Sequence, residues 1–82
     1  MTTTAPRSVR DLAVGESAVL AEPLMDVGHR MRLAEMGLRA GERVTLAQRS
    51  VGGARVVAVR GSRIALDSRT AAQLPVLAGA AT

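Results

Sequence analysis

The sequence contains no cysteine, no lysine and no Phe, Tyr or Trp. The absence of cysteine excludes disulfides, thiolate nucleophiles, iron–sulfur clusters and zinc–thiolate sites. Without aromatic rings, the core has to consist of Val, Leu, Ile, Met and Ala, and no large flat side chain is present to stack on a base or a sugar. Without lysine, the chain has no phosphate loop of the G-x-x-x-x-G-K-[ST] type, so we expect no binding of GTP by the protein itself.

What the sequence does contain is typical of one small globular domain. It has 82 residues, of which 48% are hydrophobic, and a net charge of +4 from eleven arginines against seven acids. The arginines are spread along the chain, which favours a general role in solubility over a single nucleic-acid or lipid surface. The longest nearly apolar run, residues 74–81, is far shorter than the roughly 20 residues of a membrane helix, so we expect no direct membrane insertion.

Turn-forming residues divide the chain into short segments in which apolar residues alternate. Val44 and Leu46 lie two residues apart, as do Val57 and Val59, and this period is typical of strands with one buried face. The segments that read as strands are residues 17–21, 43–48, 55–60 and 63–66. We predict that the core contains Leu33, Leu38, Val44, Leu46, Val57, Val59, Ile64 and Leu66.

Glycines mark the connections between these strands. The pair Gly52-Gly53 adopts positive φ at no steric cost, which favours a hairpin between the second and third strands. Gly61-Ser62 is expected to turn the chain into the fourth strand. We also expect residues 1–8 to be a disordered leader, residues 9–77 to be the domain and residues 78–82 to be a flexible tail.

One segment, residues 26–37, has helical spacing instead. Its apolar residues Val27, Met31 and Ala34 lie on one stripe, which Leu33 and Met36 widen. We expect the two methionines, Met31 and Met36, to be core fillers.

The ends of this predicted helix carry recognisable signals. Asp26 is placed to cap its first turn, and Gly37 to end it in a left-handed conformation, after which Leu38 packs back onto the last turn. Two side-chain ion pairs are expected along it, Asp26–Arg30 and Arg32–Glu35.

Residues 32–41, RLAEMGLRAG, resemble the hallmark of the FeoA family, an RL-x-E-[LM]-G-[LIM]-x-[PA]-G stretch. Residues 12–16 look like the family's opening L-x-x-G-E turn, and Ala71, Leu74 and Val76 like its closing pattern. The similarity covers about residues 9–77 in the same order and spacing. It departs at Ala54, where the family commonly has proline, and at Asp67, where a basic residue is frequent.

The resemblance implies a mainly β fold, a small SH3-like β-barrel with one short inserted α-helix. The same fold occurs as a C-terminal domain in iron-dependent repressors of the DtxR type, so fold alone does not define function. The resemblance further implies a small, non-enzymatic, cytoplasmic accessory or regulatory protein of ferrous iron transport. Its partner would be a GTP-dependent ferrous iron transporter of the FeoB type, contacted at the cytoplasmic side.

Protein contact is the mode of action that the residues themselves favour. SH3-like barrels offer grooves and strand edges, and a basic domain can dock on an acidic partner by charge complementarity. We expect the contact on the helix and the turn at residues 37–41, with the glycine hairpin as a second contact. The candidate contact residues are Arg32, Glu35, Gly37, Leu38, Arg39, Arg43, Gly52 and Gly53.

Catalysis and a resident cofactor are not predicted. The only histidine is His29, the acids are scattered, and no nucleophile has an adjacent base. Met25, His29 and Met31 cluster in the sequence beside Asp26, which makes His29 and Asp26 the candidates for a transition-metal site. No second histidine follows four residues later to complete a bidentate pair on the helix.

Nucleic-acid binding is the alternative from another class, in keeping with the repressor kinship. Arg30, Arg32, Arg39 and Arg43 could form a basic face for phosphates. No aromatic platform or RNA-binding signature accompanies them. We therefore expect no specific nucleic-acid partner, and the oligomeric state stays open.

Overall fold

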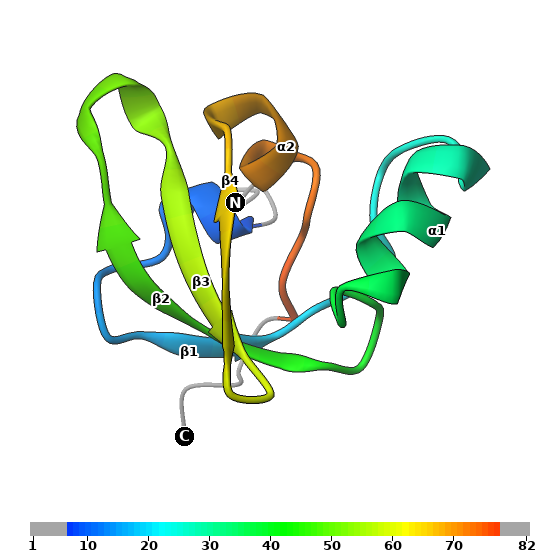
Figure 1. Ribbon diagram of the computed structural model, residues 1–82, viewed down its shortest axis with the longest axis horizontal. Helices are drawn as coiled ribbons and strands as arrows, with labels where there is room; N and C mark the ends of the chain where they lie inside the picture. Colours follow the sequence, from blue (N-terminus) through cyan, green and yellow to red (C-terminus); the bar gives the residue numbers. More distant parts are fainter. Residues whose placement is uncertain (1–6, 78–82) are drawn as a thin grey trace, which may run out of the picture.

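The computed structural model describes residues 7–77, whose main feature is one antiparallel sheet with its strands in chain order (Figure 1). The strands are β1 (Ser17–Val19), β2 (Arg43–Arg49), β3 (Arg55–Val59) and β4 (Ser62–Leu66). All four predicted strands are present, with ends shifted by one or two residues. The register between β2 and β3 shifts between Leu46 and Gln48, which is a local irregularity of the β-bulge type.

The sheet curls into a barrel because the last described residues return to its first strand. Leu20, directly after β1, forms an antiparallel bridge with Val76, and Ser8 forms one with Pro75. Ser8 is buried, and the carbonyl oxygen of Arg7 accepts a hydrogen bond from the Val76 N–H at 2.9 Å. The fold thus includes Arg7 and Ser8, which were predicted to belong to the disordered leader. Residues 1–6 and the predicted tail 78–82 lie outside the described part.

The predicted helix is α1 (Val27–Glu35), and both of its expected caps are present. The Asp26 carboxylate accepts a hydrogen bond from the His29 N–H. At the other end, Gly37 has a φ of +99°, and the Leu38 N–H donates to the Leu33 carbonyl at 2.9 Å. This is the Schellman arrangement, in which the residue after the glycine folds back onto the last turn.

Three short elements were not predicted. They are the 3-10 turns η1 (Val9–Asp11) and η2 (Val51–Gly53) and a second helix, α2 (Ser68–Ala72). The Asp67 carboxylate caps α2 by accepting a hydrogen bond from the Thr70 N–H at 2.7 Å. Such an Asp before a short run of helix-compatible residues is the signal that could have revealed α2.

The core lies between the curled sheet and two of these elements, η1 and α2. Seven of the eight predicted core residues are buried, and Ile64 is partly buried against them. The buried apolar residues are Val9, Leu12, Ala18, Leu20, Leu33, Leu38, Val44, Leu46, Val57, Val59, Leu66, Ala71, Leu74 and Val76. Arg55 is buried too, at 7% exposure, on the same face of β3 as Val57 and Val59.

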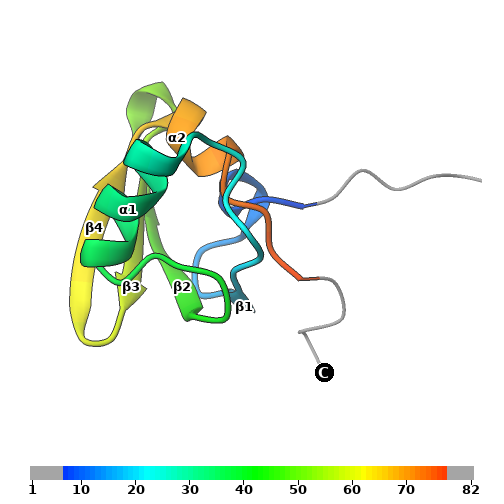
Figure 2. The same ribbon diagram turned by 90° about the vertical axis from the view of Figure 1, so that its right-hand side faces the viewer.

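Helix α1 stands at the side of the barrel, next to α2 (Figures 1 and 2). Leu33 is its one buried residue, whereas Met31 is 61% exposed and Met36 46%. The prediction that the methionines fill the core is therefore wrong: the helix is attached along a narrow line at Leu33 and through Leu38 beyond its end. No helix within residues 7–77 has the length and hydropathy needed to cross a membrane.

Candidate functional site

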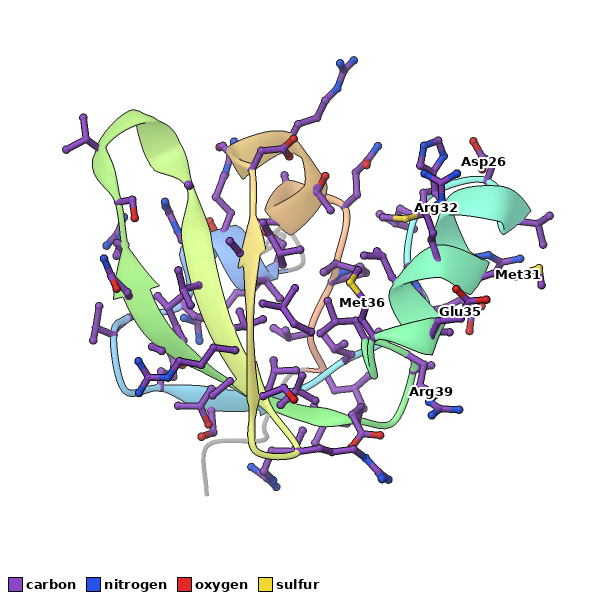
Figure 3. All side chains as sticks on the ribbon, viewed as in Figure 1. Asp26, Met31, Arg32, Glu35, Met36 and Arg39 are labelled. Carbon is purple, nitrogen blue, oxygen red and sulfur yellow. The ribbon has the colours of Figure 1, made fainter. Side chains whose placement is uncertain are left out.

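The exposed apolar stripe of α1 forms one wall of a groove on the side of the helix away from α2. Val27 and Met31 are each 61% exposed, and Met31 points away from the barrel (Figure 3). The groove has a volume of about 340 Å³ and is called the outer groove below. Its lining residues are Glu22, Pro23, Val27, Arg30, Met31, Ala34, Leu38, Arg39 and Ala40.

The charges around the outer groove leave a net positive rim. Arg30 pairs with Glu22, so the predicted pair of Arg30 with Asp26 is wrong. The Nε of Arg30 is buried and has no hydrogen-bond partner within the part of the chain described. Arg39 is exposed at the edge of the groove, and among residues 7–77 no acid pairs with it.

A second depression lies on the other side of α1, between α1 and α2. It has a volume of about 410 Å³ and is called the inner cleft below. Its lining residues are Met25, Asp26, His29, Arg32, Leu33, Met36, Arg69, Thr70 and Gln73. Arg32 and Met36 extend from α1 toward this side (Figure 3), so α1 presents two different surfaces, an outer and an inner one.

The two candidate metal ligands meet at the rim of the inner cleft. Both carboxylate oxygens of Asp26 lie 2.9 Å from Nδ1 of His29, and both side chains are largely exposed. The pKa of Asp26 is lowered, first because its carboxylate accepts the His29 backbone N–H and then because of the His29 ring. Within residues 7–77, no group of three or more His, Cys, Asp or Glu side chains is placed to hold a metal ion.

Of the two methionines predicted to lie near Asp26 and His29, only one does. Met25 lines the inner cleft together with His29, but Met31 lies in the outer groove. Met36, from the end of α1, takes its place in the inner cleft. Thioethers prefer cuprous copper, whereas imidazole and carboxylate suit ferrous iron, so only His29 and Asp26 of this set match iron as ligands.

The predicted contact residues of α1 and its exit turn fall into two groups. Arg32, Glu35 and Arg39 are exposed, with Arg32 at the inner cleft and Arg39 at the outer groove. No hydrogen bond or ion pair joins Arg32 to Glu35 in the described region, so that predicted pair is absent. Leu38 is fully buried, and its side chain serves the core and the floor of the outer groove.

The remaining contact residues lie elsewhere on the barrel. Arg43 is exposed at the start of β2, a short distance along the chain from α1. Gly52 and Gly53 both have positive φ in η2, which connects β2 to β3 as predicted. This hairpin lies at the opposite side of the molecule from α1 (Figure 1). A Cβ on Gly53 would lie 3.0 Å from the Cβ of Ser68, so Gly53 has a packing role against α2.

Two residues of these surfaces were missed in the sequence. Val27 was recognised as part of the helical stripe but not as a residue of the outer groove, which it lines. Helical periodicity reveals a stripe but not what covers it. Arg69 lines the inner cleft because α2 places it there. Recognition of α2 through its Asp67 cap would have placed Arg69 on a helix, but its position opposite α1 comes from the tertiary structure.

Comparison with known proteins agrees with this fold. Residues 7–77 match the family model of the FeoA domain. The crystal structure of an iron uptake regulatory protein, FeoA, has a TM-score of 0.79 at 21% identity, covering 88% of this chain and 96% of the other. The FeoA of Stenotrophomonas maltophilia, solved with zinc and called a prokaryotic SH3 domain protein, has a TM-score of 0.73 at 26% identity, covering 90% and 93%.

The barrel also occurs as part of larger proteins. A manganese-dependent transcriptional repressor has a TM-score of 0.73 at 22% identity; the alignment covers 90% of this chain but 43% of the repressor. At this identity the likeness concerns the fold alone. A comparison with curated proteins found no match. The match to a prokaryotic SH3 domain protein and the curled four-stranded sheet confirm the predicted SH3-like barrel.

Proposed function

Because this chain belongs to the FeoA family, we propose that it is a non-enzymatic accessory protein of ferrous iron transport. It works in the cytoplasm by binding the cytoplasmic side of a GTP-dependent ferrous iron transporter of the FeoB type. The S. maltophilia relative, itself proposed to be a bacterial ferrous iron transport activating factor, supports the link to ferrous transport.

The observation that carries the proposal is the outer groove. A helix on a small barrel normally turns its apolar stripe inward, whereas α1 leaves Val27 and Met31 more than half exposed. Exposed apolar residues gathered along one groove, with polar residues at the rim, are characteristic of protein-binding surfaces. The outer groove is therefore the contact that we assign to the transporter.

Charge at the rim of the groove defines the partner's surface. Arg39 is exposed and unpaired within residues 7–77, and Arg43 follows on β2. Arginines at the rim of an interface favour an acidic partner, and such rim charges act mainly on the association rate and on its salt dependence. We include Glu35 and the Gly37 turn in the contact because they belong to the same helix and its exit turn. Arg32, also a predicted contact residue, lines the inner cleft on the other side of α1 and is not assigned to this contact.

The glycine hairpin is proposed as a second contact of the same partner. Gly52 is exposed, but the hairpin and α1 lie on opposite sides of the barrel (Figure 1). A partner would have to reach around the sheet to hold both. The hairpin is thus tested separately from the outer groove.

The experiment is co-purification of the tagged protein with the detergent-solubilised transporter, together with ferrous uptake in cells that carry each variant. Met31→Glu places a charge in the groove, and Arg39→Glu reverses the rim; both should reduce co-purification about tenfold or more. Arg49→Glu tests the hairpin separately, since Arg49 is exposed at the hairpin end of β2. Arg63→Glu is the matched control, because Arg63 is exposed on β4 and lines neither the outer groove nor the inner cleft. Loss of binding only in Arg49→Glu would move the contact to the hairpin. Unchanged uptake and transporter assembly after deletion of the protein would overturn the proposed function.

The alternative functions have no comparable support. For a metal-binding role, Asp26 and His29 supply two ligands that already bond to each other. For a nucleic-acid role, the repressor likeness concerns the fold alone. Metal binding and nucleic-acid binding therefore stay predictions.

A further inference from the structure

The inner cleft combines two unpaired guanidinium groups with an apolar floor. Arg32 comes from α1 and Arg69 from α2, and both line the cleft from opposite walls. Both are exposed, and within residues 7–77 neither makes an ion pair or a side-chain hydrogen bond. Asp67 is near enough for Arg69 to contribute to its lowered pKa, after its bonds to Thr70, but its carboxylate caps α2 and forms no ion pair with Arg69. Two facing cations that form no ion pair within the described residues make a surface that favours an anionic group.

The acid of the inner cleft does not neutralise these arginines. Asp26 is its one carboxylate, and that carboxylate is bonded to the N–H and to the ring of His29. It caps the first turn of α1, where the helix dipole also favours its negative charge. Within residues 7–77, no ion pair joins this carboxylate to Arg32 or to Arg69.

The floor of the inner cleft is apolar and adaptable. It is formed by Met25, Leu33 and Met36, of which Leu33 belongs to the core and Met36 is 46% exposed. Methionine side chains are unbranched and polarizable, so they adjust to apolar groups of different shape. At the edge, the side-chain amide of Gln73 has no hydrogen-bond partner among the described residues and is free to hold a peptide group.

We propose that the inner cleft binds an acidic peptide segment of a partner protein in which a carboxylate lies next to an aliphatic side chain. Arg32 and Arg69 hold the carboxylate, since a guanidinium offers paired N–H donors that match its two oxygens. The aliphatic side chain rests on Met25, Leu33 and Met36. An inorganic anion or a nucleic-acid phosphate would use the arginines but leave the apolar floor uncovered.

This site is separate from the outer groove and does not depend on the proposed function. The two surfaces lie on opposite sides of α1, and no residue lines both. A partner that occupied both would hold α1 between two of its segments. The inference is tested on the purified full chain, with no transporter present.

The probe is a blocked peptide, Ala-Leu-Asp-Leu-Ala, titrated into the ¹⁵N-labelled protein while amide chemical shifts are followed. Saturable shifts are expected at the residues of the inner cleft. The matched peptide with Asn in place of Asp should bind roughly fivefold to tenfold more weakly. Arg32→Gln and Arg69→Gln should each lower the affinity for the Asp peptide by a similar factor, whereas Arg49→Gln, on an exposed residue at the far end of β2, should leave it unchanged.

Several outcomes would overturn the inference. Equal affinities for the Asp and Asn peptides would show that the carboxylate is not recognised. Chemical-shift changes confined to the outer groove would show that the peptide binds there and not in the inner cleft. Inorganic phosphate and a short DNA duplex are titrated at the same ionic strength. If phosphate or the duplex shifted the same cleft residues at concentrations equal to or lower than those of the Asp peptide, the cleft would be an unspecific anion site. The spectra of the variants show directly whether each is folded.

Discussion

The guanidinium of Arg55 donates hydrogen bonds to the backbone carbonyl of Arg10, a residue 45 positions earlier in the chain, at 3.1 and 3.3 Å. The same group donates to the Gly53 carbonyl at 2.7 Å. Arg55 is buried and no carboxylate pairs with it within residues 7–77. One side chain thus joins η1 to the hairpin between β2 and β3 by satisfying backbone acceptors that would otherwise be left unpaired.

Arg55→Met is expected to destabilise the protein. Methionine fills much of the same space but leaves the carbonyls of Arg10 and Gly53 without their donor in these part-buried bonds. A hydrogen bond to a charged group contributes about 1.5–3 kcal/mol, and partial access of water to the carbonyls favours the lower end of this range. Urea unfolding monitored by far-UV circular dichroism measures the difference. Arg49→Met is the control, because Arg49 lies opposite Arg55 in the sheet but is exposed. Equal stabilities of the two variants would show that the Arg55 bonds contribute nothing net.

Leu33→Ala is expected to lower the free energy of unfolding by about 2–5 kcal/mol, because it removes the one buried side chain of α1. Met31→Ala should change it little, since Met31 is 61% exposed. Hydrogen exchange of the α1 amides should also quicken in Leu33→Ala and not in Met31→Ala. If Leu33→Ala melts within a degree or two of wild type, Leu33 does not contribute to the core as proposed.

Gly37→Val tests the end of α1. At a φ of +99° a β-branched side chain is strained, at a cost of about 1–3 kcal/mol. A Cβ at Gly37 would meet the Val59 side chain at 3.7 Å, an ordinary contact, so the backbone conformation and not lack of space causes the loss. The melting temperature should therefore fall more in Gly37→Val than in Ala34→Val, which introduces the same side chain inside the helix. Equal melting temperatures would mean that the Schellman turn carries no strain for valine.

The strand faces and helix ends could be predicted from the sequence because they depend on residues that are close together in the chain. Alternating Val57 and Val59 predicted β3, and Asp26 with Gly37 predicted both ends of α1, because strand faces and helix caps depend on neighbouring residues. The same alternation places Arg55 on the buried face of β3. That feature was overlooked because an arginine is rarely expected inside.

The candidate surfaces were less predictable because they depend on how distant elements pack. Periodicity identified the stripe of Val27, Met31 and Ala34 correctly, but Met31 was expected in the core and is exposed. The short α1 is attached at Leu33 and at Leu38 beyond the turn, and this attachment leaves the stripe outward. The inner cleft needs α2 opposite α1, so Arg69 could not be paired with Arg32 without the tertiary structure.

DNA binding is expected to be weak and unspecific. The net charge of +4 favours contact with phosphates at low salt, but counterion release makes such binding fall steeply as salt rises. Electrophoretic mobility-shift assays with two unrelated duplexes should show equal, weak retention that disappears near physiological salt. Tight binding that prefers one duplex would favour the repressor-like alternative over the proposed function.

The last prediction concerns acid stability and the ion pair between Arg7 and Glu16. Two hydrogen bonds, at 2.8 and 2.9 Å, join the Arg7 guanidinium to the Glu16 carboxylate, which also accepts the Ala13 N–H at 2.9 Å. The Arg7 side-chain bonds, followed by the Ala13 bond, lower the pKa of Glu16 from 4.5 to about 2. Because the folded state holds the ionised carboxylate, this pair stabilises the fold fully above pH 4.5, and its contribution is lost as the pH falls from there to about 2.

Glu16→Gln should therefore be less stable than wild type at pH 7 and converge with it near pH 2. The measurement is the free energy of unfolding by urea at a series of pH values between these limits. Glu35→Gln is the control, since Glu35 is exposed and has no ion pair in the described region. Its stability should follow wild type across the series. The contrary result would be a constant difference in stability between Glu16→Gln and wild type from pH 7 to pH 2. That result would show that the carboxylate titrates alike in the folded and unfolded chains, and that its bonds with Arg7 do not stabilise the fold.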